Sequence, residues 1–218
     1  MPDRAVALPT RHSKGFLFIV AVVAALALCT IVAVAAQAKT ASRSVRGVLT
    51  TWTMTPALTA ELLDASIIPM PVSPSAVTPT VHAASYTFPI TKGTLDAATQ
   101  HGTIYHSGGL LLARYTTPTT MPTSWQTLSL TRFIIHLGSH AYVTAIVNGG
   151  VRETIATLDL SKDHVTYIFA KHQHYVLISG ITVALSATAI SAINAEFGTS
   201  LTAPVTLGGA WIEVRVVS

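Results

Sequence analysis

The sequence predicts a mainly β fold, either an antiparallel β-sandwich or an open barrel, with two short helices. From Lys39 onward, Val, Ile, Thr and Leu occur in short runs separated by Gly, Asn, Ser and Pro, which is typical of many strands joined by tight turns. Two segments with apolar residues at helical spacing begin at residues that favour helix caps. No repeat of roughly 20 to 50 residues is visible, which argues against a propeller or a solenoid.

The first 38 residues form a separate segment. Arg4, Arg11 and Lys14 precede a long uncharged apolar stretch that ends in Ala36-Gln37-Ala38. A basic region, an apolar region and a small-x-small site together are typical of an export signal peptide, with cleavage expected after Ala38. The apolar stretch approaches the roughly 20 residues that span a bilayer, so an uncleaved membrane anchor is the alternative. In both cases residues 39–218 are expected to form one β-rich domain outside the cell, secreted or at the cell surface.

Cysteine and charge usage exclude several classes of protein. The only cysteine, Cys29, lies in the apolar stretch, so residues 39–218 contain no disulfide, no thiol nucleophile and no cysteine-ligated metal. Of the 13 basic and 9 acidic residues, 3 basic and 1 acidic residue precede Lys39, which leaves a net charge of +2. The basic residues are scattered rather than clustered. Nucleic acid is therefore not expected as a partner.

The domain is expected to begin with a strand over 44–54, with Val48, Thr50, Trp52 and Met54 on one face, and a helix over about 56–67. Thr55 suits the N-cap of this helix and the following proline suits its first position. Four prolines follow within 69–84. Because proline lacks the amide hydrogen that a central strand needs, this stretch is expected to be an extended, exposed connection.

A strand over 86–90 and a hairpin are predicted next. The hairpin would join strands over 103–106 and 110–115 through Ser107, Gly108 and Gly109, because glycine adopts the positive φ of such turns. A proline- and threonine-rich loop over 116–124 leads to a long strand over 125–137. The apolar residues of this strand change face midway, so a bulge is expected near Thr131-Arg132.

The C-terminal part is expected to form further hairpins, the second helix and a closing strand. Asn148-Gly149, which lies between alternating apolar residues, is the strongest short hairpin signal in the chain. Ser186 suits the N-cap of the second helix, and Gly198 suits its end. The final strand is expected over 211–217.

Several segments resemble a group of secreted actinobacterial β-rich proteins, which are similar in turn to the HtaA-type domain of surface haem-uptake proteins. The segments are Tyr86 to Gly93, Gly102 to Leu110, Leu158 to Ser161 and Leu185 to Gly198. In that family a tyrosine ligates the haem iron and a histidine in a glycine-flanked turn supports it. The resemblance therefore implies Tyr86 as the ligand and His106 as its support. A phenolate suits ferric iron, and a neighbouring histidine can hold its proton or its orientation.

His106 has two interpretations from sequence. It is either a histidine at a strand end whose ring bonds to the backbone of the glycine turn, or a residue that contacts the ligand. His172 and His174 would point the same way in an extended segment, a geometry that can chelate a metal. Since no third ligand is near them in sequence, no metal site is predicted.

No nucleophile elbow, HExxH motif, or Walker-type or dinucleotide-type glycine pattern occurs, so catalysis is not predicted. The sequence predicts a secreted or surface-anchored binding domain, with haem as the leading ligand and cofactor. A cell-envelope structural or adhesion domain without a small ligand is the alternative. The membrane is expected as a partner only through an uncleaved N-terminal segment. A haem domain needs an apolar pocket, an inward tyrosine hydroxyl and a histidine within hydrogen-bond reach, whereas an adhesion domain needs none of these.

Overall fold

The computed structural model describes residues 42–79, 83–114 and 125–217. The predicted signal or anchor over 1–38 and the predicted loop over 116–124 lie outside these residues, as do residues 80–82 of the proline-rich stretch. The chain divides into two units, Met1–Thr40 and Ala41–Ser218, and the described residues belong to the second.

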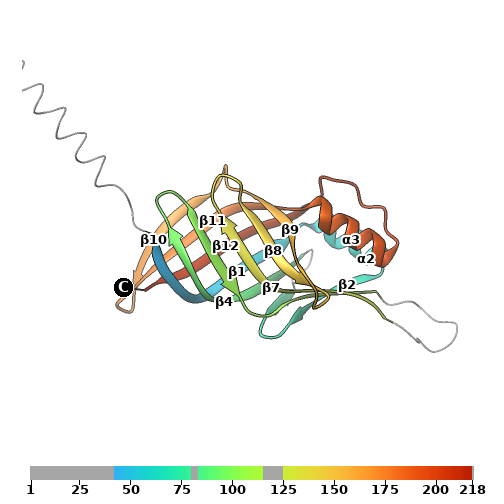
Figure 1. Cartoon of the computed structure of the whole chain (residues 1–218), viewed down its shortest axis with the longest axis horizontal. Coiled ribbons are helices and arrows are strands. Elements are labelled where there is room, and N and C mark those ends of the chain that lie inside the picture. The colour runs from blue at the N-terminus through green and yellow to red at the C-terminus, as the bar shows by residue number, and fades with distance from the viewer. Residues whose placement is uncertain (1–41, 80–82, 115–124, 218) are drawn as a thin grey trace, which may run out of the picture. The chain divides into compact units, whose positions relative to one another are not determined.

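Eight antiparallel strands of this unit close into a barrel (Figure 1). In order around the barrel they are β7 (Gln126–Leu137), β5 (His101–His106), β4 (Ala84–Asp96), β1 (Arg43–Met54), β12 (Thr206–Val216), β11 (Gln173–Leu185), β9 (Arg152–Asp159) and β8 (Tyr142–Val147), which pairs with β7 again. The mainly β prediction with two helices is confirmed. Of the two architectures that the sequence left open, the barrel is present, and it is closed rather than open.

Four further strands extend the sheet beyond the barrel. They are β2 (Ile67–Val72), β3 (Ala76–Pro79), β6 (Gly109–Arg114) and β10 (His164–Ala170). β6 pairs with β7 and with β2, while β3 pairs with β4 and β10 pairs with β11.

The predicted hairpin around Ser107-Gly108-Gly109 is wrong. β5 and β6 do not pair with each other but follow one another along the same partner, β5 against residues 134–137 of β7 and β6 against residues 126–131. Gly108 does have a positive φ, 77°, but it kinks an extended chain instead of reversing it. The local pattern identified the conformation of the glycine, whereas the pairing depends on β7, which lies further along the chain.

The proline-rich stretch is not the connection that the sequence predicted. β2 pairs with β6 from Ile67 opposite Arg114 to Val72 opposite Gly109, and β3 pairs with β4. β2 lies at one end of the strand order, so among the described strands one of its edges has no partner, and prolines are tolerated there. The helix α2 (Pro56–Asp64) is accordingly shorter than predicted, because Ile67 begins β2.

The predictions that rest on local backbone chemistry are confirmed. The Thr55 hydroxyl accepts the Leu58 amide hydrogen at the N-terminus of α2, and α3 (Ala187–Phe197) has Ser186 as N-cap and Gly198 as left-handed C-cap. Asn148 and Gly149 have positive φ between β8 and β9. The β7–β8 register shifts between Thr131 and Ile134, which is the predicted bulge.

The core has two parts. One fills the barrel with fully buried side chains such as Ile104, Ile178 and Ile212. The other joins the barrel to the helices, through Leu58 and Leu62 of α2 and through Ile193 and Phe197 of α3. Figure 1 shows both helices together at one end of the barrel. Neither of these helices, the only ones in the described ranges, is long and apolar enough to span a bilayer.

Arg114 ties the C-terminal ends of both helices to β6. Its Nε donates to the carbonyl oxygen of Ala65, the C-cap of α2, at 2.9 Å, and its Nη1 donates to the carbonyl oxygen of Phe197, the last residue of α3. C-terminal carbonyls lack partners within their helix and carry partial negative charge. The Arg114 guanidinium therefore supplies a hydrogen bond to a carbonyl oxygen at the C-terminal end of each helix.

Replacing Arg114 by methionine is expected to lower the free energy of unfolding by about 2 kcal/mol. Hydrogen bonds to a charged group contribute roughly 1.5–3 kcal/mol, and methionine preserves much of the apolar stem. Urea denaturation monitored by circular dichroism measures the change. Arg46→Met, at an exposed position of β1, is the matched control and should change stability by less than about 0.5 kcal/mol. An equal loss in the two variants would contradict the role of Arg114.

Candidate functional site

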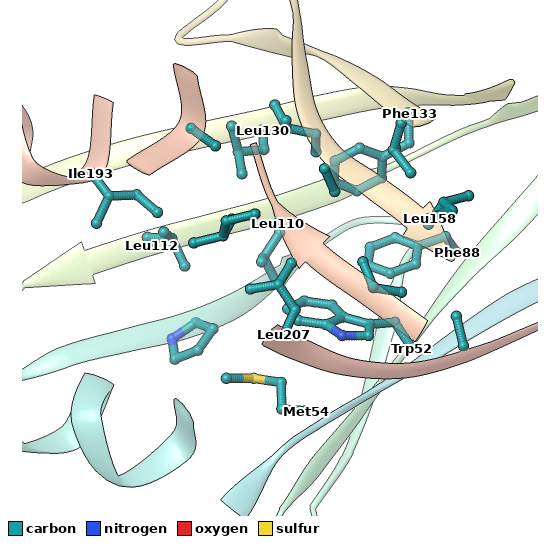
Figure 2. A pocket seen from close by; sticks show the side chains of 18 of the residues that line it. Trp52, Met54, Phe88, Leu110, Leu112, Leu130, Phe133, Leu158, Ile193 and Leu207 are labelled. Atoms are coloured by element: carbon teal, nitrogen blue, oxygen red, sulfur yellow. The ribbon is translucent and has the colours of Figure 1, made fainter. Parts of the chain in front are cut away.

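An apolar cavity of about 130 Å³ lies between the barrel strands and the two helices. Figure 2 shows its wall, to which Trp52 and Met54 of β1, Phe88 of β4, Leu110 of β6 and Ile193 of α3 contribute. Apolar cavities of about this size exclude water and accept groups about as large as a benzene ring.

Strand alternation and residue size together create the cavity. Thr50, Trp52 and Met54, at every second position of β1, all line it and so share a face, as predicted. Val48, which was predicted on the same face, is not a wall residue, because the β1 register shifts between Val45 and Val48. Several other wall positions carry only a methyl group, where a larger side chain would take up more of the space. These positions are Ala156, Ala189, Ala192 and Ala210.

His106 lies in the cavity wall and is only 6% exposed. Its Nδ1 lies 3.3 Å from the carbonyl oxygen of Phe133, and its Nε2 lies 2.8 Å from the Thr50 hydroxyl. A carbonyl oxygen can only accept, so Nδ1 carries the hydrogen and Nε2 accepts from Thr50. Burial lowers the pKa of His106 from 6.5 to about 4, against the opposing effect of backbone hydrogen bonds. The ring is therefore neutral at pH 7.

Tyr86 is buried, 2% exposed, but it is not one of the wall residues of this cavity. Its hydroxyl donates to the carbonyl oxygen of Pro69 at 3.1 Å, and its ring stacks on Trp52 with 5.6 Å between ring centroids. Burial raises the pKa of Tyr86, which disfavours the phenolate. The structure thus brings His106 to the cavity and engages the Tyr86 hydroxyl with backbone.

Ser107, Gly108 and Gly109 are not wall residues either, and their backbone joins neighbouring strands. The Ser107 amide donates to Pro89, the Gly109 amide donates to the Ser75 hydroxyl, and the Gly108 carbonyl accepts from Arg132. The predicted bond from the His106 ring to the turn backbone is wrong, because the ring reaches across to β7 and β1 instead.

Sequence reasoning did not name Thr50 or Trp52 as site residues. Thr50 completes the bonding of His106, and the two residues are 56 positions apart in the chain. Trp52 Nε1 is buried and has no hydrogen-bond acceptor among the described residues. The alternation of Thr50, Trp52 and Met54 was the available signal, since polar atoms on an inward strand face must find partners inside the fold.

No protein-family model matches the chain, and the comparison with curated proteins also finds no match. Solved structures that are similar to it include two from one organism. The haem binding protein HtaB from Corynebacterium glutamicum is 12% identical with a TM-score of 0.49, and the match covers 81% of this chain and 96% of that one. The C-terminal domain of HtaA from the same organism is 14% identical with a TM-score of 0.49, over 81% of this chain and 100% of that one. Their names are of the HtaA type, to which the group that the sequence resembles is similar, and a likeness of this degree assigns neither a ligand nor a site to this chain.

Proposed function

We propose that the chain is a non-catalytic binding domain that takes an apolar ligand into its barrel cavity outside the cell. The observation that carries this proposal is the cavity itself, about 130 Å³ with an apolar surface beside the paired His106 and Thr50. Small-molecule sites combine such an apolar lining with a few fixed polar groups. The location outside the cell rests on the basic, apolar and small-x-small pattern of residues 1–38.

Haem is the specific ligand that we propose to test first. A metal-ligating histidine usually donates its second ring hydrogen to a carbonyl or carboxylate, as His106 donates Nδ1–H to Phe133. Its neutral ring suits a ligand role at pH 7. The cavity volume of about 130 Å³ fits haem less well, because sites for drug-sized ligands span roughly 300–1,000 Å³. A porphyrin would need the cavity to widen, and Nε2 would have to exchange the Thr50 hydroxyl for iron.

Haemin titration followed by absorbance tests this proposal on wild type, His106→Ala and Tyr86→Phe. We expect a saturable Soret shift in the wild type, at least about tenfold weaker binding in His106→Ala through loss of the nitrogen ligand, and nearly unchanged binding in Tyr86→Phe. Far-UV circular dichroism confirms that each variant is folded. If haemin binding is lost in Tyr86→Phe alone, the iron ligand is Tyr86, the residue that the sequence resemblance implied. The absence of a Soret shift in the folded wild type would exclude haem as the ligand.

A structural or adhesion domain is the second candidate, and strand β10 favours it. Tyr167 and Phe169 on this strand are 67% and 65% exposed, and among the described strands β10 pairs only with β11. Exposed aromatic side chains on an edge strand offer a surface for another chain. If self-association measured by sedimentation is abolished by Tyr167→Ser, and no apolar ligand binds, this second function is preferred.

A further inference from the structure

We propose that the barrel docks on the surface of an anionic lipid bilayer through strand β10 and the cations on the strand ends beside it. This docking surface consists of Tyr167, Ile168 and Phe169 together with Arg43, Arg46, Lys171 and Arg215. It is separate from the cavity, so the inference goes beyond the proposed function and does not depend on a cavity ligand. Strand β10 is also the surface of the second candidate function, and the experiment below distinguishes a bilayer from a second chain.

The apolar part of the docking surface is a strand that solvent reaches. Tyr167 and Phe169 are 67% and 65% exposed, and Ile168 between them is also exposed. Aromatic side chains are enriched where a protein meets lipid headgroups, because a ring can rest on apolar acyl chains while polar groups stay hydrated. Among the described strands β10 pairs only with β11, so its other edge keeps unpaired backbone groups. Such groups are tolerated at the hydrated bilayer surface but not in its hydrocarbon core.

The strand register brings cations to the same end of the barrel. Tyr175 of β11 lies opposite Ile168 of β10 on one side and opposite Arg215 of β12 on the other. The end of β12 pairs in turn with the start of β1, which carries Arg43 and Arg46, both exposed. Figure 1 shows β10 at the end of the barrel opposite to α2 and α3. The exposed aromatic side chains and the cations therefore lie on four neighbouring strands at one end of the barrel.

The charge of these strand ends favours an anionic partner. Residues 43–46, 164–176 and 214–217 contain four Lys or Arg residues and no Asp or Glu. Asp96, which follows the β4 residue opposite Arg43, offsets only one of these charges. Near an anionic bilayer each Lys or Arg increases affinity about fivefold. A second copy of the chain would place the same cations against one another, which is unfavourable.

The order of segments along the chain supports a bilayer as the occupant. Strand β1 begins at Arg43, and the uncharged apolar stretch ends at Ala38, so only residues 39–42 separate them. A connection of this length spans at most roughly 18 Å. If the apolar stretch is retained as the membrane anchor that the sequence left open, it would hold the start of β1 near the bilayer. The docking surface includes the start of β1.

Fluorescence quenching of the full chain in lipid nanodiscs tests the inference. In a Cys29→Ser background, Ala170→Cys places a fluorophore at the exposed end of β10, and a quencher is attached to the lipid headgroup. We expect quenching at residue 170 to be at least about threefold stronger in phosphatidylglycerol than in phosphatidylcholine discs. Val151→Cys is the matched label position. It is 68% exposed and precedes β9, where the Thr154 carbonyl accepts from the N-cap of α3, so its quenching should be weak and equal in both lipids.

Variants in the labelled chain identify the side chains responsible. The double substitution Tyr167→Ser and Phe169→Ser should reduce quenching at residue 170 in phosphatidylglycerol to the phosphatidylcholine level. Leu63→Ser is the matched control, because it removes an apolar side chain that is 62% exposed on α2, and should leave quenching unchanged. Arg46→Gln should lower the ratio of docked to free barrel about fivefold, and added salt should lower it further. Far-UV circular dichroism confirms that each variant is folded.

Three results would overturn the inference. They are equal quenching at residue 170 in the two lipids, quenching that the double serine variant retains, and a full chain that associates with neither disc. A fluorescence change at residue 170 that needs no lipid and grows with protein concentration would also overturn it and would assign β10 to a second copy of the chain. None of these results involves the cavity, so the proposed function would stand or fall separately.

Discussion

Lowering the pH from 7 to 4 is expected to reduce the free energy of unfolding of the wild type by about 3 kcal/mol more than that of His106→Gln. Burial lowers the pKa of His106 from 6.5 to about 4 in the folded chain. Between these two values the unfolded chain binds a proton that the folded chain does not. The contribution of His106 to the free energy of unfolding is therefore fully present above pH 6.5. It decreases as the pH falls toward 4 and is not reduced further below that value.

Urea denaturation at a series of pH values measures this difference. Glutamine cannot take up a proton, so the other titrating groups act alike in both proteins and cancel. His136 is one of these groups, because burial and then the charge of Arg152 lower its pKa as well. Parallel stability curves for wild type and His106→Gln between pH 7 and 4 would contradict the burial of a neutral His106 against Phe133 and Thr50.

The features that the sequence predicted correctly depend on neighbouring residues. Ser186 caps α3 because its hydroxyl lies within reach of an amide three residues later, and Gly149 permits the turn of a hairpin whose strands flank it directly. The shared face of Thr50, Trp52 and Met54 follows from strand alternation alone. Each of these predictions requires only the conformation of a few consecutive residues.

The features that the sequence did not predict depend on which strands meet. Gly108 has the conformation of a turn residue, but β7 pairs with the chain on both sides of it, and this pairing prevents a hairpin. The prolines of β2 indicate an edge, yet they do not identify β6 as the partner. His106 was singled out for its glycine neighbours, whereas its bonding partners, Thr50 and Phe133, come from β1 and β7. The cavity depends on all of these pairings together.

Replacing Gly108 by alanine is expected to cost at least about 3 kcal/mol, while Gly149→Ala should cost only about 1 kcal/mol. Both glycines have similar positive φ, 77° and 71°, so the backbone penalty is nearly the same. A Cβ at Gly108 would lie 2.3 Å from the Ser75 hydroxyl and 2.6 Å from the Val72 carbonyl oxygen, whereas Gly149 has nothing within 4 Å. Urea denaturation of the two variants isolates the effect of packing, and equal losses would contradict it.

The same substitution should disturb the site through the bulge of β7. The Gly108 carbonyl accepts the Arg132 amide hydrogen, and the next residue, Phe133, holds Nδ1 of His106. Displacing Gly108 would loosen the bulge and admit water to the imidazole, so the pKa of His106 should rise from about 4 toward 6.5. Histidine NMR titration of Gly108→Ala measures the shift, with Gly149→Ala as control. A rise confined to Gly108→Ala would mean that the glycine motif acts on His106 by holding its backbone partner in place; an unchanged pKa would separate the motif from the cavity.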